Sequence, residues 1–154
     1  MTKFQPFQIR WGENVGKPEC PYLKRWVINV GLFSIRLHYW MGSDDQRYFH
    51  DHPWSFIVIV LRGSYVDASP AGKDYLGPGS IRFRKATHQH TVIIQEGTCL
   101  SLLITGPQIR DWGFWIPGRD RLLRPLRYFS RYGHHQCQDT VERTTKESPQ
   151  NETF

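Results

Sequence analysis

The chain has 154 residues, of which 14% are aromatic, enough for one well-packed domain. Ten Pro and 13 Gly divide it into short segments, which favours strands joined by turns over long helices. No run of about 18 apolar residues occurs, which excludes a membrane-spanning helix, and residues 1–10 lack the apolar segment of a secretory signal. We therefore expect a cytoplasmic protein without a membrane partner.

Three cysteines, Cys20, Cys99 and Cys137, provide no disulfide framework, because one thiol stays unpaired in any scheme. A reducing compartment suits them. Cys137 follows His134 and His135 closely, and together with Cys20 these residues form an alternative candidate for a structural zinc site.

The net charge of +6 is concentrated toward the C-terminal end, where residues 119–131 hold five arginines and one acid. A solvated basic face explains this pattern. Contact with nucleic acid is the sharper hypothesis, since aromatic residues alternate with the arginines. The residues concerned are Arg119, Arg121, Arg124, Arg127 and Arg131 with Tyr128, Phe129 and Tyr132.

Residues 1–25 mix proline, glycine and charge with scattered aromatics, which predicts an extended N-terminal arm packed on the domain. From Trp26 to Trp40 apolar and polar residues alternate, the pattern typical of a strand with two different faces. Residues 42–45 then form a turn.

A second strand is predicted over residues 49–61, because the stretch from Phe56 to Leu61 is rich in β-branched residues. Further strands are expected at 80–84, 88–95, 98–105 and around Trp112 to Ile116, with a loose connection between Ser69 and Gly79. Short strands at roughly ten-residue intervals predict an all-β sandwich or barrel over residues 26–118. Residues 119–137 are a basic extension containing a short helix or edge strand, and we expect 138–154 to be a disordered tail.

Histidines mark the candidate site. Side chains at i and i+2 of an extended segment leave the same face, so His50 and His52 can point at one centre. A second His-x-His pair, His88 and His90, follows 38 residues later. Imidazole binds iron, zinc, copper and nickel. The pattern therefore predicts a divalent metal site.

The same residues resemble the first motif of the cupins, a family of small double-stranded β-helix (jelly-roll) proteins. That motif has a glycine, a His-x-His pair, a glutamate and a closing glycine, and Gly42, His50, His52 and Gly63 match it. Phe56 occupies the glutamate position. The resemblance thus implies a site built from histidines, without the family's acidic ligand.

The second cupin motif resembles Gly79 to His90, which implies His90 as the third ligand and leaves His88 as the competing candidate. Over about residues 11–137 the chain is similar to small, uncharacterised cupin-like proteins of bacteria and phages that carry a His-Asp-His-Pro-Trp motif. The resemblance implies an all-β cupin jelly roll in a single domain. Small jelly rolls often pair through an edge strand, so a homodimer is a reasonable expectation.

Alternation also predicts the wall of the pocket. If Phe33 and Ile35 face one way, Arg36 and His38 face the other, which on a jelly-roll strand can be the cavity wall. Guanidinium groups there would select a carboxylate or phosphate. The candidates for contact with a small anionic substrate are Arg36, His38, Arg47, Arg84, Trp54 and Phe56.

Several functions fit this pattern. The leading hypothesis is an enzyme resembling an iron(II) oxygenase, because a three-histidine site is similar to those of thiol dioxygenases. With zinc the same ligands would favour hydrolysis or isomerisation, and manganese and nickel are further alternatives. A non-catalytic ligand-binding or regulatory cupin is the competing class, and nucleic-acid association is a third. The sequence alone does not decide whether the chain is an enzyme.

Overall fold

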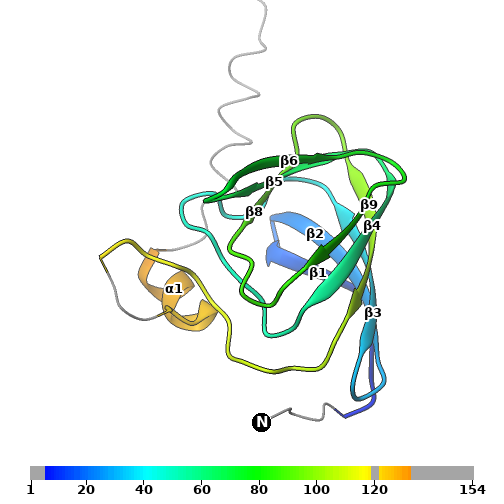
Figure 1. Cartoon of the computed structure of the whole chain (residues 1–154), viewed down its shortest axis with the longest axis horizontal. Helices are drawn as coiled ribbons and strands as arrows, with labels where there is room; N and C mark the ends of the chain where they lie inside the picture. Colours follow the sequence, from blue (N-terminus) through cyan, green and yellow to red (C-terminus); the bar gives the residue numbers. More distant parts are fainter. Residues whose placement is uncertain (1–5, 119–121, 133–154) are drawn as a thin grey trace, which may run out of the picture.

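Two antiparallel sheets enclose the interior of the molecule (Figure 1). The computed structural model describes residues 6–118 and 122–132. A six-stranded sheet has the order β1-β2-β3-β9-β4-β7, and a three-stranded sheet has the order β6-β5-β8. The elements are β1 (Gln8–Lys17), β2 (Cys20–Asn29), β3 (Ser34–Trp40), β4 (Phe56–Arg62), β5 (Tyr65–Ser69), β6 (Gly72–Leu76), β7 (Ile81–Arg84), β8 (Thr91–Ile93), β9 (Cys99–Thr105) and α1 (Pro125–Tyr132).

Alternating side chains fill the space between the sheets. On β4, Phe56, Val58 and Val60 point inward and are at most 4% exposed. They pack in one cluster with Leu103 of β9 and Leu76 of β6. Because apolar residues from both sheets meet there, the predicted all-β class is confirmed.

Gly63 closes the turn that leads from the larger sheet to the smaller one. Its φ of 71° is a conformation that side chains disfavour, and a Cβ at this position would lie 2.0 Å from the carbonyl oxygen of Thr98. The residue that matches the closing glycine of the first cupin motif is therefore required by the backbone.

Several predicted elements differ in detail. The region from Trp26 to Trp40 is two strands, because Gly31 (φ 99°) makes a turn in which the N–H of Val30 donates to the carbonyl of Phe33. The expected loop between Ser69 and Gly79 contains β6, paired with β5. The strand expected around Trp112 to Ile116 is wrong: this segment makes only single-residue bridges, through Phe114 to His50 and Leu123.

Both ends of the described chain add to the barrel. Residues 8–25, expected to be an arm, lie in the β1–β2 hairpin, which continues the larger sheet beside β3. Pro125 begins α1, where a proline suits the first turn of a helix. Tyr128 of this helix is fully buried and stacks on Phe114, with ring centroids 3.7 Å apart. Of the two forms expected after residue 121, the structure shows the helix.

Parts of the C-terminal predictions lie outside the described residues: Arg119, Arg121, the group His134, His135 and Cys137, and the tail 138–154. Within the described part of the chain, no helix is long and apolar enough to cross a membrane.

Candidate metal centre

The segment before β4 carries the first two histidines and is held in place through its backbone. His50 and His90 exchange two backbone hydrogen bonds of 2.9 and 2.8 Å, and the N–H of His52 donates to the carbonyl of Ala86. β4 itself begins only at Phe56, after Pro53. The two histidine-bearing segments therefore lie side by side although 38 residues separate them.

Asp51, between the two histidines, points away from the site and anchors it from behind. It is fully buried and accepts hydrogen bonds of 3.0 Å from the backbone N–H of Gly113 and the indole N–H of Trp115. The Arg110 guanidinium also donates to this carboxylate. Alternation along the segment therefore works as predicted, with His50 and His52 on one side and Asp51 on the other.

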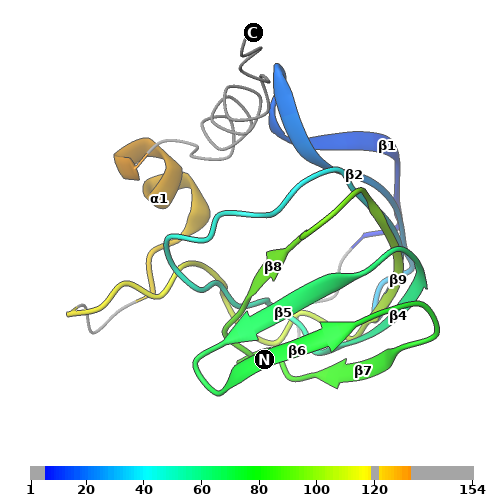
Figure 2. The same ribbon diagram turned by 90° about the horizontal axis from the view of Figure 1, so that it is seen from above.

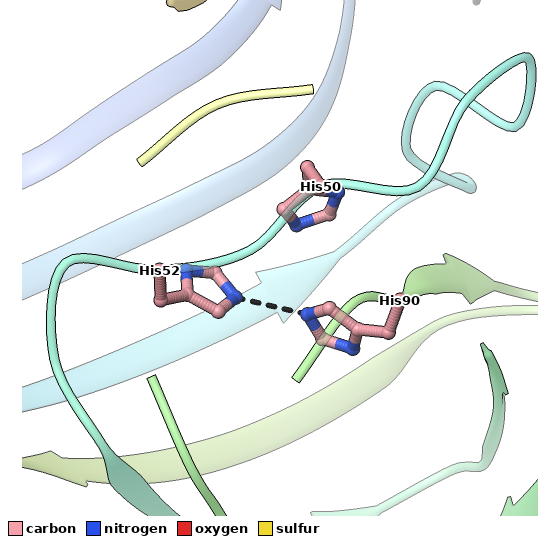
Figure 3. Close-up of side chains that lie close together, drawn as sticks. All are labelled: His50, His52 and His90. Atoms are coloured by element: carbon pink, nitrogen blue, oxygen red, sulfur yellow. Dashed lines mark hydrogen bonds between the residues drawn. The ribbon is translucent and has the colours of Figure 1, made fainter. Parts of the chain in front are cut away.

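The side chains of His50, His52 and His90 converge on one space, as Figure 3 shows. One nitrogen from each ring lies within 4.8 Å of the others, and the Nε2 atoms of His52 and His90 are 2.9 Å apart. Two nitrogens bound to one ion at about 2.0–2.1 Å and at a right angle would also be roughly 2.9 Å apart. The two rings share a hydrogen bond at this distance (Figure 3), and the same separation also fits a first-row metal ion.

Electrostatics keep two of these rings ready to bind metal. Burial, assisted by the neighbouring His90, holds the pKa of His50 and of His52 well below the usual value. Both rings are therefore neutral near pH 7, with a lone pair available. A neutral imidazole is the form that ligates metal.

Asp67 of β5 lies behind His90 and was not anticipated from the sequence. Its carboxylate accepts a hydrogen bond of 2.9 Å from Nδ1 of His90, which leaves Nε2 directed at His52. Burial alone would raise the pKa of Asp67, but hydrogen bonds from His88, His90 and Arg84 outweigh it and hold the pKa below its usual range. The one available signal was an acid in the otherwise uncharged strand Tyr65–Ser69.

His88 belongs to a second, overlapping group of donors. Its Nε2 lies 3.2 Å from both carboxylate oxygens of Asp67, and Asp67, His88 and His90 could also hold an ion. In that group the carboxylate is already paired with Arg84 at 2.8 Å. His90 is common to both groups, so the two cannot use it independently.

Asp44, from the turn predicted over residues 42–45, lies behind His50. Its Oδ2 is 3.7 Å from Nδ1 of His50, whereas its Oδ1 accepts hydrogen bonds from the side chain of Thr91 and the N–H of Val92. Burial raises the pKa of Asp44 well above the usual value. Burial therefore favours the neutral form of this carboxyl beside the ligands.

Aromatic rings enclose the histidines. Trp54 stacks on His52 with ring centroids 4.7 Å apart and 9° between planes, and Phe56 meets the same ring edge-on at 5.1 Å. The ring centroid of Trp112 lies 6.3 Å from that of His52 and 6.4 Å from that of His50. Trp54 and Phe56 thus line the site, as alternation predicted.

Arg36 and His38 face the interior from β3, as alternation predicted. The Arg36 guanidinium lies 4.6 Å from the centre of the Trp54 ring and donates to Ser34 Oγ at 2.9 Å. Within the described part of the chain it forms no salt bridge. Burial, and then repulsion from Arg25, lowers the pKa of Arg36 to about 10.

His38 is 7% exposed, and neither of its ring nitrogens has a hydrogen-bond partner in residues 6–118 or 122–132. Burial, followed by the charge of Arg36, lowers its pKa to about 3. The ring is therefore neutral, and its one N–H is a donor without an acceptor.

The other two arginine candidates are engaged elsewhere. Arg84 forms salt bridges with Asp67 at 2.8 Å and Asp74 at 2.7 Å. Arg47 contacts Asp45 at 2.5 Å and donates to the carbonyl of Tyr132 at 2.6 Å, which ties it to α1. Both positive charges already face partners of this chain.

In the described part of the basic segment, one arginine pairs with an acid of the same chain. Arg124 pairs with Asp111 at 2.6 Å.

Comparison with known proteins supports the fold and goes no further. No family model matches the chain, and no curated protein matches its sequence. Similar solved structures include the DMSP lyase DddQ from Ruegeria pomeroyi DSS-3 (TM-score 0.56, 17% identity, 74% of this chain and 64% of the lyase). A protein with a double-stranded beta-helix domain from Klebsiella pneumoniae is also similar (TM-score 0.52, 13% identity, 65% of this chain and 90% of that protein). So is the iron(II) form of HppE (TM-score 0.51, 10% identity, 60% of this chain and 54% of HppE). The chain thus spans somewhat under two thirds of the lyase, and the predicted double-stranded β-helix (jelly-roll) fold is confirmed.

Proposed function

We propose that the chain is a metal-dependent enzyme that acts on a small anionic molecule. The observation that carries the proposal is the convergence of His50, His52 and His90, with nitrogens within 4.8 Å of one another. Iron(II) is the metal we favour, and zinc, manganese and nickel are the alternatives. Structural similarity to an iron(II) protein supports this choice.

His50, His52 and His90 would hold the ion, and Asp67 would fix the ring of His90 through Nδ1. We favour this group over Asp67, His88 and His90, because Arg84 already neutralises the Asp67 carboxylate. An ion held by three neutral ligands keeps its full charge and open coordination positions, so it supplies Lewis acidity or a binding place for a second reactant. Trp54 and Phe56 place apolar surface beside the ion.

The anionic nature of the substrate is proposed from Arg36. A half-buried guanidinium without a salt bridge in the described residues is costly, and an anion from solution would compensate it. His38 could donate its unpaired N–H to another oxygen of the same molecule. Arg36 lies on the Trp54 ring, which in turn stacks on His52, so the anion would lie close to the metal.

A screen of metal-loaded protein tests the proposal. We would measure turnover of small carboxylates, phosphates and thiols, with oxygen uptake as one readout, under iron(II) and then zinc. We expect at least one substrate whose turnover is abolished by chelation and whose KM rises when Arg36 is changed to Met. Arg82→Met is a matched control, because Arg82 pairs with Asp74 on a half-exposed part of the barrel.

A non-catalytic cupin is the second candidate, favoured by the way the site ties segments together. The backbone of His50 bonds to that of His90, and Asp51 bonds to residues 110–115. If the metal only staples these segments, chelation will lower the melting temperature while the screen yields no turnover with any metal.

A further inference from the structure

The outer face of the six-stranded sheet is apolar across five neighbouring strands. Antiparallel sheets that cover a core on one side usually place polar residues on the other. Here two rows of apolar side chains face outward instead, each crossing β2, β3, β9, β4 and β7 at paired positions. The first row is Ile28, Ile35, Ile104, Ile57 and Phe83, and the second is Trp26, Leu37, Leu102, Ile59 and Ile81.

These two rows, here called the outer patch, are open to solvent at six of their ten positions. In the first row the exposed fraction runs from 39% for Ile57 to 61% for Phe83, and in the second row Ile81 is 59% exposed while the other four side chains are half-buried. α1 lies on the opposite side of the barrel from β3, β9 and β4 (Figure 1), and the view from above agrees (Figure 2). None of the ten outer-patch positions carries a charge.

The exposed area of the outer patch approaches that of a protein interface. Its six side chains that are 39–61% exposed present on the order of 500–600 Å² of apolar surface, at the top of the range of about 300–600 Å² for the largest patch on a monomer. A standard interface buries about 800 Å² on each partner. Beyond the second row, Lys24 and Arg62 pair with Tyr39 and Leu100, so charged side chains border the outer patch at that end. A neutral centre with a charged rim is typical of an interface.

We propose that the outer patch binds the outer patch of a second copy of this chain, forming a two-fold dimer with the six-stranded sheets packed face to face. Aligned sheets stack about 10 Å apart through branched side chains such as isoleucine. A neutral surface is complementary to itself, as a two-fold interface demands. With the axis along the rows, Lys24 and Arg62 of one copy lie at the opposite end from those of the other, so the like charges do not meet.

This dimer differs from the edge-strand pairing expected from the sequence, and it is independent of the proposed function. The histidine site opens inside the barrel, whereas the outer patch lies on the other face of the same sheet. Loss of one therefore leaves the other measurable.

The test is the mass of the full chain in solution by sedimentation equilibrium. We expect twice the 18.2 kDa chain mass at micromolar concentration. Ile104→Lys, at the central strand, should weaken the dimer about 100-fold or more, because each interface contains the change twice. Tyr75→Lys, 61% exposed on β6 of the other sheet, is the matched control and should leave the dimer intact.

A milder double variant, Ile57→Thr with Ile104→Thr, covers the case in which the lysine disturbs folding, and circular dichroism checks each variant. A wild-type protein that is monomeric at micromolar concentration would overturn the proposal. The same holds if the monomer binds lipid vesicles through this face. An Ile104→Lys protein that folds and dimerises as tightly as wild type would also overturn it, as would a Tyr75→Lys control that dissociates as readily as Ile104→Lys.

Discussion

An ordinary half-buried strand places apolar side chains toward the interior and polar ones toward solvent, but β3 largely reverses this arrangement. Toward the interior it presents a serine, an arginine and a histidine before it ends at the core residue Trp40, whereas toward solvent it presents isoleucine, leucine and tyrosine. Burying polar groups costs free energy unless they are paired, and exposing an apolar row forgoes stabilisation. Both costs have an explanation if the interior binds an anion beside a metal and the outer face binds another protein surface. The residues are Ser34, Arg36 and His38 inside and Ile35, Leu37 and Tyr39 outside.

The largest expected change in stability comes from the inner face of β9, where Leu103 points inward and its neighbour Ile104 points outward. Leu103 is 6% exposed and packs in the core, so Leu103→Ala should lower the free energy of unfolding by about 2–5 kcal/mol. Urea denaturation measures this, and the loss should not depend on protein concentration. A loss below that of Ile104→Ala would contradict the assignment of the faces.

His38→Leu should raise stability, because the histidine donor is buried without a partner in the described residues. We expect a gain of about 1–3 kcal/mol at pH 7 in metal-free protein. The folded pKa of His38 is about 3, below the 6.5 of the free side chain, so as pH falls below about 6.5 the unfolded state takes up a proton that the folded state does not. This linkage costs no stability above about pH 6.5, and it lowers the free energy of unfolding progressively as pH falls toward 3. The variant should therefore lose less stability in acid than wild type. A destabilised variant at pH 7 would show that His38 has a partner.

Asp67→Asn should weaken metal binding by about 10–100-fold, the usual cost of losing a carboxylate behind a histidine ligand. Competition with a chelator measures the affinity. Asp74→Asn is the control, since Asp74 also pairs with Arg84 but does not contact His90. Equal losses in both variants would assign the effect to Arg84.

Ile104→Ala gives the smallest effect, because the side chain is 40% exposed in the monomer. At low protein concentration we expect a loss of about 0.5 kcal/mol or less. At high concentration the wild type should gain melting temperature through dimerisation and the variant should gain less. If the melting temperatures of both proteins rise equally with protein concentration, Ile104 does not lie in the dimer contact.

Much of the site could be predicted because its signals are local. The spacing of His50 and His52 fixes their common direction, and alternation along residues 33–40 placed Arg36 and His38 inside. The role of Asp67 could not be predicted, because it depends on the pairing of β5 with β8, which brings together residues far apart in sequence. The same applies to Arg84, whose acidic partners Asp67 and Asp74 become neighbours only in the fold.

The fold was predictable in class and less so in detail. Turn residues and β-branched runs predict strands, but the break at Gly31 and the short strand β6 arise where glycine permits a backbone that the surrounding sheet selects. The apolar residues of β3 gave a clear pattern whose meaning was ambiguous, since a sequence does not say which face is the interior. The structure shows that the apolar row faces outward.

The most direct test of the metal site is the metal content of protein purified without oxygen. We expect close to one iron, or one other divalent ion, per chain in the wild type and in His88→Asn, and none above background in the His50→Ala, His52→Ala double variant. Equal metal in the wild type and the double variant, with loss in His88→Asn, would contradict the assignment of the three converging histidines.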